Sequence, residues 1–279
     1  LLKLLNVEDS DEEYKPLEGF PKDVIYTEEE EEYVNSLSVE NKEKIIELET
    51  KMLDKNKNKI PDRFRILNTG LSISVKNNII NRLDHFYSLE ETDNEYHKLS
   101  QWVYGLNKIP FDTYTESVVN ITDKSEKIVT YLQDVKTNLD NAVFGHNTAK
   151  TTIIQEIARQ ITNPTSFGNC IAIQGPPGNG KTTLIKDGVC KAINRPFAFI
   201  TLGGLQNSEF LIGHEYTYEG SKSGRIVEIL QESGTMDPVI YFDELDKLSD
   251  SPKGEEIANL LCHLTDTSQN DSFHDKYYS

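Results

Sequence analysis

Cysteine and long apolar runs are scarce in this 279-residue sequence, and each scarcity excludes a class of protein. The cysteines, Cys170, Cys190 and Cys262, lie far apart and form no CxxC pair. This spacing argues against a disulfide framework and a cysteine-ligated metal site, and it favours a reducing compartment. We therefore expect the cytoplasm by default, with an organelle matrix or a virus-infected cell left open. No apolar run approaches the roughly 20 residues of a membrane-spanning helix, so we expect no membrane partner.

Positive charge is also scarce, since 29 Lys and Arg face 46 Asp and Glu and give a net charge of -17. Binding to nucleic-acid phosphates needs an excess of basic side chains, so this balance argues against a general nucleic-acid binder. Hydrophobic residues make up 37% of the chain and charged residues 27%. These proportions predict a folded core that is diluted by solvated segments.

The start of the sequence is rich in acidic residues. Runs at 8–13 and 28–32 are separated by Pro16, Gly19 and Pro21. We interpret residues 1–35 as an acidic tail, disordered or loosely attached. The first residue is Leu rather than Met, so we expect the natural N-terminus to lie elsewhere.

Residues 36–135 are predicted to be mainly helical. Apolar residues recur at helical spacing over 39–53, and two further stripes over 73–108 predict two helices, the second ended by Pro110. Trp102 belongs to the second stripe, which we interpret as core. Asp54 begins a stretch with alternate-ligand spacing, but Lys59 and Arg65 replace the glycine and glutamate of a calcium loop. A solvated, helix-breaking turn is the better interpretation.

Residues 136–279 show the alternation of an α/β domain. Short apolar runs at 170–173, 197–200 and 239–242 predict buried parallel strands. Helical stretches at 182–194 and 225–233 lie between them. Strands that alternate with helices predict a parallel sheet with right-handed crossovers.

A phosphate-binding loop follows the first of these runs. The sequence from Gly175 to Thr182 satisfies G-x-x-x-x-G-K-[ST], between a predicted strand and a predicted helix. The glycines let successive N–H groups converge on phosphate oxygens, and the helix adds its positive end. Lys181 would reach the β- and γ-phosphates of ATP and Thr182 would ligate Mg²⁺. The predicted nucleotide-binding residues here are Gly175, Pro176, Pro177, Gly178, Asn179, Gly180, Lys181, Thr182 and Thr183.

An acidic pair, Asp243 and Glu244, ends the run at 239–242. Such a strand end lies at the ligand crevice of an open α/β sheet, which places the pair beside the phosphate loop. We expect Asp243 to hold Mg²⁺ and Glu244 to act as the general base on water. The alternative is a surface pair that caps the next helix.

Together these motifs resemble the Lon family of AAA+ ATP-dependent proteases. Gly175–Thr182 and Asp243–Lys247 look like its GPPGxGKT and DEIDK elements. Leu202-Gly-Gly204, Gly213-His214 and Thr217–Gly220 are similar to its LGG, GH and TYxG elements, in the same order. Val143, Phe144 and Gly145 resemble the segment that lines the family's adenine pocket. The resemblance covers about residues 70–279.

The resemblance implies an α/β fold, with a P-loop AAA+ parallel sheet flanked by helices. The mainly helical region and the acidic tail would precede it, giving divisions at 1–35, 36–135 and 136–279. It implies an ATPase that uses ATP and Mg²⁺ and assembles with itself as a hexameric ring. Its substrates would be unfolded or tagged proteins, which the ring would unfold and translocate for proteolysis. Lys181 and Glu244 would be catalytic, and Tyr218 and Glu219 would form the substrate pore loop.

The sequence also departs from the family pattern. Glu219 replaces an apolar pore residue, and Glu215 and Tyr216 replace basic residues. We expect the sensor residue, arginine finger, lid and serine–lysine protease domain beyond residue 279. One alternative is an AAA+ chaperone without protease activity. A second is a nucleic-acid-remodelling ATPase, but the acidic net charge and the 217–220 loop argue against it. A third is a nucleotide switch that does not hydrolyse ATP, and the presence of Glu244 argues against that one. Tyr218 could instead be a core tyrosine.

Overall fold

A computed structural model gives the fold of the chain. It describes residues 20, 26–57, 60–163, 170–218, 220–266, 268–270 and 273–279. The chain divides into two compact units between Arg65 and Ile66. We describe each unit by itself.

The first unit contains helix α1 (Glu28–Ser36) and helix α2 (Val39–Lys57). Helix α1 occupies part of the segment that we interpreted as an acidic tail, disordered or loosely attached, and disorder is the wrong interpretation for residues 28–35. A capping box explains the difference: Thr27 N donates to Glu30 Oε2 at 2.8 Å, and Glu30 N donates to Thr27 Oγ1 at 3.4 Å. The glutamates of the first turn also favour a helix N-terminus.

Helix α2 extends through Lys57, so the turn that we expected from Asp54 onward is wrong for residues 54–57, which are helical. Residues 58 and 59 lie outside the described residues, and so do residues 1–19 of the acidic tail. Helix α3 (Asp62–Leu67) follows Pro61 and contains the division between the two units.

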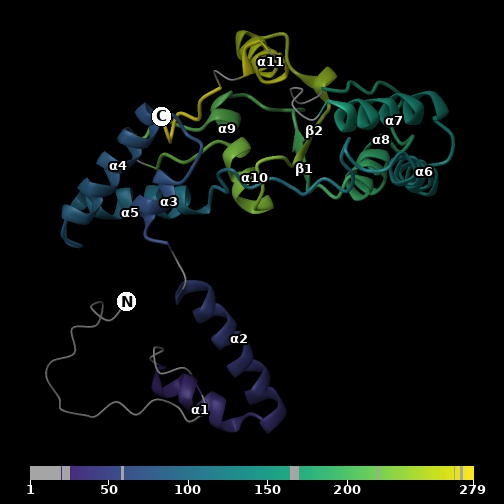
Figure 1. The fold of residues 1–279 in the computed structure, drawn as a ribbon. Coiled ribbons are helices and arrows are strands. Elements are labelled where there is room, and N and C mark those ends of the chain that lie inside the picture. Colours follow the sequence, from purple (N-terminus) through teal and green to yellow (C-terminus); the bar gives the residue numbers. More distant parts are fainter. Residues whose placement is uncertain are drawn as a thin grey trace, which may run out of the picture. The chain divides into compact units, whose positions relative to one another are not determined.

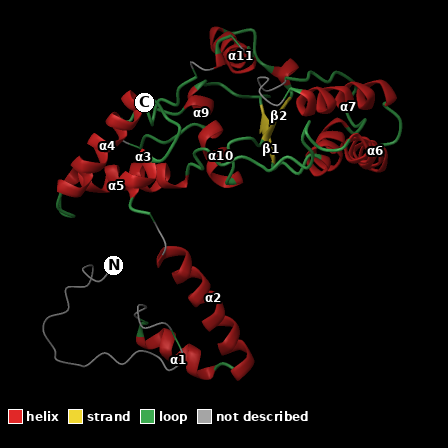
Figure 2. Ribbon diagram, in the orientation of Figure 1, coloured by secondary structure: helices red, strands yellow, loops and turns green. Residues whose placement is uncertain are grey.

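The second unit holds the remaining elements, and most of them are helical (Figures 1 and 2). They are α4 (Ile73–Ser88), α5 (Asn94–Lys108), α6 (Ser125–Ala142), α7 (Asn147–Thr162), α8 (Lys181–Thr183), the π-helical η1 (Leu184–Cys190), β1 (Phe197–Thr201), α9 (Glu209–Ile212), α10 (Arg225–Ser233), β2 (Val239–Asp243), the 3₁₀ turn η2 (Leu245–Lys247) and α11 (Pro252–Thr265).

Strands β1 and β2 form a parallel pair, with Phe197 opposite Val239 and Thr201 opposite Asp243. Both strands confirm the prediction from the sequence. The predicted strand at 170–173 is wrong, because residues 170–176 have no regular secondary structure. An apolar run becomes a strand only beside a partner edge, and in the described part of the chain only β1 and β2 pair.

Helices cover both faces of this pair. Phe197, Val239 and Tyr241 contact a core formed with α6, α7 and η1. The alternate residues of both strands, including Ile200 and Phe242, pack with α9, α10 and α11. Side chains alternate between the faces of a strand, so Asp243 lies on the face of Tyr241, toward η1. The α/β class predicted from the sequence is therefore confirmed.

Helices α4 and α5 pack against the end of the chain. Their core contains Trp102, which is 1% exposed, together with Val227 of α10 and Tyr277. Trp102 Nε1 donates to Tyr277 O at 3.1 Å, and the C-terminus lies beside α4 in Figure 1. The core role predicted for Trp102 is confirmed. Because α4 and α5 share one compact unit with residues 136–279, the boundary that we predicted at 135/136 does not separate compact units.

Among the described residues, none of the helices combines the length and the apolar character that crossing a bilayer requires.

Candidate active site

The loop from Gly175 to Gly180 has a left-handed backbone conformation at two positions, and only glycine adopts this conformation without strain. Gly178 has φ +74° and Gly180 has φ +83°. Helix α8 begins directly after it at Lys181, as the sequence predicts. The loop therefore ends at a helical N-terminus whose first N–H groups are free to bind an anion.

Lys181 reaches back over this loop. Its Nζ donates to Gly175 O at 2.8 Å and to Pro176 O at 2.9 Å. A primary ammonium has three donors and few geometric constraints, so it can exchange these carbonyls for phosphate oxygens at the same place. The geometry brings together the residues at 175–183 that the sequence predicts to bind a nucleotide.

The end of β2 lies beside the phosphate loop. Thr182 Oγ1 donates to the hydroxyl of Tyr241 at 3.5 Å. Asp243 lies two residues further along the same face of the strand, and its Oδ1 accepts from Glu244 N at 3.0 Å. Asp243, the first residue of the predicted acidic pair, therefore lies on the face of β2 that is directed toward Thr182. The contact with Tyr241 was missed, because no sequence motif marks this tyrosine.

Glu244 follows the strand in a left-handed backbone conformation, with φ +58°. Its side chain is exposed and lies against Gly203, which follows β1. A left-handed conformation in a non-glycine residue costs energy, so it is kept where the surrounding structure enforces it. Gly203 belongs to the LGG element, but the sequence alone does not connect it with Glu244.

The segment Val143–Gly145 lies across from the loop. A Cβ at Gly180 would lie 3.1 Å from Val143 Cγ1, so the Val143 side chain packs closely against the backbone of Gly180. Phe144 is 99% exposed, with its ring free to stack on a planar ligand. Lys150 is buried and fixes the segment, since its Nζ donates to Asp140 Oδ1 at 2.9 Å and to Val143 O at 2.6 Å.

His146 joins this segment to the phosphate loop. Its Nε2 is 2.9 Å from Asn179 O, and its φ is +55°. The Oδ1 of Asn179 is buried and has no hydrogen-bond partner among the described residues. His146 and Lys150 are further residues that the sequence did not single out. His146 follows Gly145 directly as the N-cap of α7, and Lys150 lies in the first turn of that helix.

The donor set suits a hard cation better than a soft metal. The Thr182 hydroxyl and the Asp243 carboxylate offer oxygen ligands, and among the described residues no group of three or more His, Cys, Asp or Glu is placed to hold a metal ion by itself. Mg²⁺ binds in such sites through one or two protein oxygens and completes its shell with phosphate oxygens and water. The residues present therefore fit magnesium with a nucleotide.

A second loop spans residues 214–222. His214 N donates to Lys222 O at 3.1 Å and closes the base of the loop. Tyr218 is 63% exposed, which excludes the alternative that it is a core tyrosine. Glu219 lies outside the described residues.

Comparison with known proteins assigns the class first. The family described as "ATPase family associated with various cellular activities (AAA)" matches residues 171–276. This range contains the whole loop at 175–183, both strands and the acidic pair.

Curated relatives narrow the class. The Lon protease homolog of Acanthamoeba polyphaga mimivirus is 37% identical over 209 residues, which cover 74% of this chain and 20% of that protein. The Lon protease of Fusobacterium nucleatum is 31% identical over 252 residues, covering 84% and 33%. That of Ureaplasma parvum is 30% identical over 236 residues, covering 85% and 28%. The chain spans about a fifth to a third of the length of these relatives.

The chain belongs to the Lon family of AAA+ ATPases. It is a nucleotide-binding ATPase segment of a Lon-like machine, as the resemblance of its motifs predicts.

Proposed function

We propose that this chain binds ATP with Mg²⁺ between the 175–183 loop, the 143–145 segment and the end of β2, and that hydrolysis drives the unfolding and translocation of protein substrates. The contact between Thr182 and Tyr241 of β2 supports this proposal, because it brings the phosphate loop to the strand that ends in the acidic pair. Proteolysis by a further domain is the proposed outcome for the substrate.

The phosphates would lie over Gly175–Thr183. The backbone N–H groups of the loop and the Lys181 ammonium would bind their oxygens, while the Phe144 ring would cover the adenine. Thr182 and Asp243 would hold Mg²⁺, which neutralises charge that develops on the phosphates. The folded-back Lys181 supports this role, since its ammonium already lies over the loop.

Glu244 would accept the proton of the attacking water. Its exposed carboxylate and its place directly after Asp243 support this role. A positioned general base contributes about 10²- to 10⁴-fold to a rate. Lys181 would bind the phosphate oxygens, both in bound ATP and in the transition state. Loss of Lys181 should therefore impair ATP binding, whereas loss of Glu244 should impair turnover alone.

The exposed Tyr218 would grip protein substrates. An aromatic ring packs against peptides of many sequences, which suits a machine with diverse clients. We propose assembly with other copies of this chain as a hexameric ring, with this loop at its pore. A reducing compartment, either the cytoplasm or an organelle matrix, is the proposed location.

Paired variants of the full-length protein test the nucleotide site. We expect Lys181→Ala to abolish ATP binding, measured by calorimetry. We expect Glu244→Gln to bind ATP as the wild type does and to lose turnover by about 10²- to 10⁴-fold. Equal ATP affinity in the wild type and Lys181→Ala would refute the assignment. A chaperone without protease activity would give the same result and would leave the unfolded client intact, so client cleavage separates these two functions.

A further inference from the structure

The loop at 214–222 contacts helices α4 and α5 through the ring of Tyr216. Lys98 Nζ, from α5, lies 4.5 Å from the centroid of this ring, and Arg82 Cζ, from α4, lies 5.4 Å from it. Both distances are within the range of about 6 Å for cation–π attraction. All three residues are partly buried, so solvent screens these contacts less than it would at an open surface.

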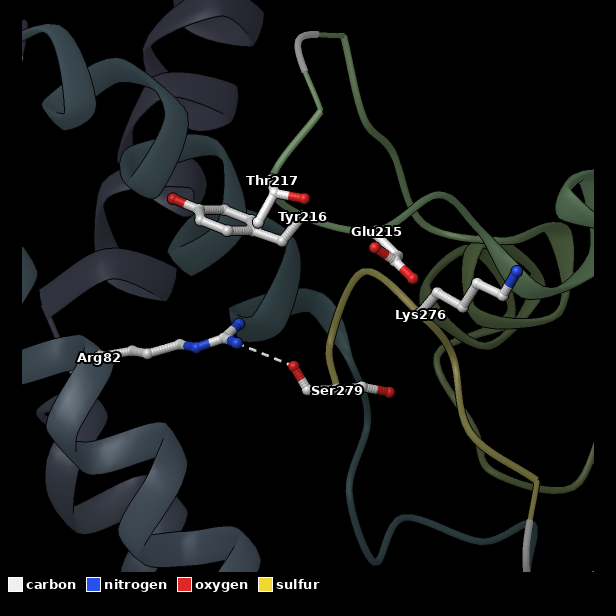
Figure 3. Close-up of a pocket in the computed structure, with 6 residues that line it drawn as sticks. All are labelled: Arg82, Glu215, Tyr216, Thr217, Lys276 and Ser279. Atoms are coloured by element: carbon white, nitrogen blue, oxygen red, sulfur yellow. Dashed lines mark hydrogen bonds between the residues drawn. The ribbon is translucent and has the colours of Figure 1, made fainter.

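Arg82 connects Tyr216 to the core of the helical pair. Its Cζ lies 5.1 Å from the centroid of the Trp102 ring, and its Nη2 donates to Ser279 O at 2.8 Å. Figure 3 shows Tyr216 and Arg82 lining one cavity, together with Ser279. Trp102 is nearly fully buried, so the guanidinium is fixed on one side by a rigid group.

The ring of Tyr216, rather than its hydroxyl, makes the contact with the cations. Its Oη is buried and has no hydrogen-bond partner among the described residues. Burial and the nearby Glu95 raise the pKa of Tyr216, so the ring is neutral at physiological pH. A neutral aromatic face accepts two cations, whereas a basic side chain at this position would add a third positive charge beside Arg82 and Lys98.

Hydrogen bonds within the loop connect Tyr216 to Tyr218, so the position of one residue affects the position of the other. Ser221 Oγ donates to Tyr216 O at 3.2 Å and joins the two limbs of the loop. Ser221 N also donates to Tyr218 O at 3.3 Å, and Tyr218 N donates to Glu215 O at 3.2 Å. The exposed ring of Tyr218 is therefore only two residues and two short turns from the contact with the helices.

We propose that Tyr216 is a positioning residue, which fixes the substrate loop on α4 and α5 through cation–π contacts and so sets the direction of Tyr218. Helices α4 and α5 would then hold the base of the 214–222 loop in place while Tyr218 contacts the substrate. The contact stands on geometry alone; its consequence for substrate handling rests on the proposed function of Tyr218.

Two variants of the full-length protein separate the ring from its bulk. Tyr216→Phe keeps the aromatic face, and Tyr216→Leu keeps apolar volume without it. Each cation–π contact corresponds to a factor of about 2 to 30 in an equilibrium constant. We expect hydrogen exchange over residues 211–224 to be about 5- to 30-fold faster in Tyr216→Leu and unchanged in Tyr216→Phe. Basal ATP turnover should stay at the wild-type level in both, because Tyr216 does not touch the nucleotide site.

A double-mutant cycle with Lys98→Met then assigns the effect to the cation. Lys98→Met should accelerate exchange in the wild-type background and have no further effect in Tyr216→Leu. Wild-type exchange in Tyr216→Leu, equal acceleration in Tyr216→Phe and Tyr216→Leu, or additive effects in the cycle would each overturn the proposal.

Unfolding of a tagged fluorescent client completes the test. We expect Tyr216→Leu to lose at least about fivefold in unfolding rate, in step with the lower limit for exchange, and Tyr216→Phe to keep it. Unfolding at the wild-type rate in Tyr216→Leu, while Tyr218→Ala abolishes it, would overturn the positioning role. If Tyr218→Ala leaves unfolding intact, the proposed function of the loop fails, and the exchange data still decide the contact of Tyr216.

Discussion

The carboxylate of Glu244 lies against the α-carbon of Gly203, at the place that a side chain on residue 203 would occupy. A Cβ built there would lie 3.2 Å from Glu244 Cδ and nearer still to Oε2. The backbone φ of Gly203 is not in the left-handed region, so alanine is compatible with the backbone. The glycine therefore leaves space for the carboxylate that we propose as general base.

We predict that Gly203→Ala lowers turnover and preserves ATP binding. The carboxylate is the end of a flexible side chain, so it would move aside while the fold stays intact. Displacing a general base should cost about 10- to 100-fold in kcat, part of its whole contribution of about 10²- to 10⁴-fold. Steady-state kinetics and ATP titration would measure the two effects.

A second background gives the control for this prediction. In Glu244→Gln there is no base to displace, so adding Gly203→Ala should have little further effect. A similar loss in both backgrounds would mean that residue 203 acts through some other group.

How far the sequence predicts this fold depends on the range of the interactions. Helix α10 spans residues 225–233 as predicted, because its apolar residues and Gly234 are local signals. Strand β2 was predicted from its apolar run and its acidic end. Helix α1 was missed because a run of glutamates has the composition of a tail, although Thr27 and Glu30 carry the signature of a capping box.

Pairings between distant residues were beyond prediction. The run at 170–173 has the composition of a strand, but composition does not reveal whether a partner edge is present. The motifs predicted the residues of the candidate site at 175–183 and 243–244. The contacts of Tyr241, Gly203 and His146 with them depend on how the elements pack, and no local pattern encodes that.

Asp237 gives a prediction for the dependence of stability on pH. Its Oδ1 accepts from Thr115 N and Thr115 Oγ1 at 3.0 Å each, and its Oδ2 lies 3.2 Å from Arg195 Nε. Burial raises the pKa of Asp237, but hydrogen bonds from Thr235 and Thr115 and the charge of Arg195 outweigh it and hold the pKa below its usual value. The charged form therefore stabilises the fold above the unfolded pKa of about 3.9, and this stabilisation is lost as pH falls through the lower folded pKa.

We expect Asp237→Asn to lower the free energy of unfolding by about 1–3 kcal/mol at pH 7. The difference from the wild type should shrink as pH falls below about 4, because the wild-type carboxylate then loses its charge as well. Urea denaturation between pH 7 and pH 3 would measure it. The exposed Asp250→Asn serves as the control and should change little at any pH. A difference for Asp237→Asn that does not vary with pH would contradict the role of its charge.

The capping box of α1 predicts a local effect. Thr27→Ala removes the side-chain acceptor of Glu30 N, and loss of such a cap costs about 0.5–2 kcal/mol of helix stability. Hydrogen exchange at residues 28–32 should accelerate, while exchange in the second unit should not change. Thr27→Ser, which keeps the hydroxyl, should behave as the wild type does. Equal exchange in Thr27→Ala and Thr27→Ser would show that the cap does not hold this helix.

Tyr218 gives the prediction that bears most directly on substrate handling. The loop that carries it turns at Gly213 and Gly220, whose φ values are +79° and +75°. Its ring is exposed. The hydrogen bonds of the described loop residues join them to one another, and none of these bonds involves a residue of the candidate nucleotide site. We therefore expect Tyr218→Ala in the full-length protein to keep basal ATP turnover and to lose unfolding of a tagged fluorescent client. Tyr218→Phe should keep both activities, because the aromatic ring is retained.

The neighbouring Glu219 extends this prediction to the choice of client. A carboxylate next in sequence to Tyr218 should repel acidic stretches of substrate and favour neutral or basic ones. Glu219→Ile should thus broaden the range of clients, and the gain should be largest for an acidic tag and should shrink as salt screens the charge. Paired clients with acidic and basic tags, followed at low and high salt, would measure it. If Tyr218→Ala instead loses ATP turnover and unfolding in proportion, the tyrosine supports the fold of the motor, and the loop does not grip the substrate.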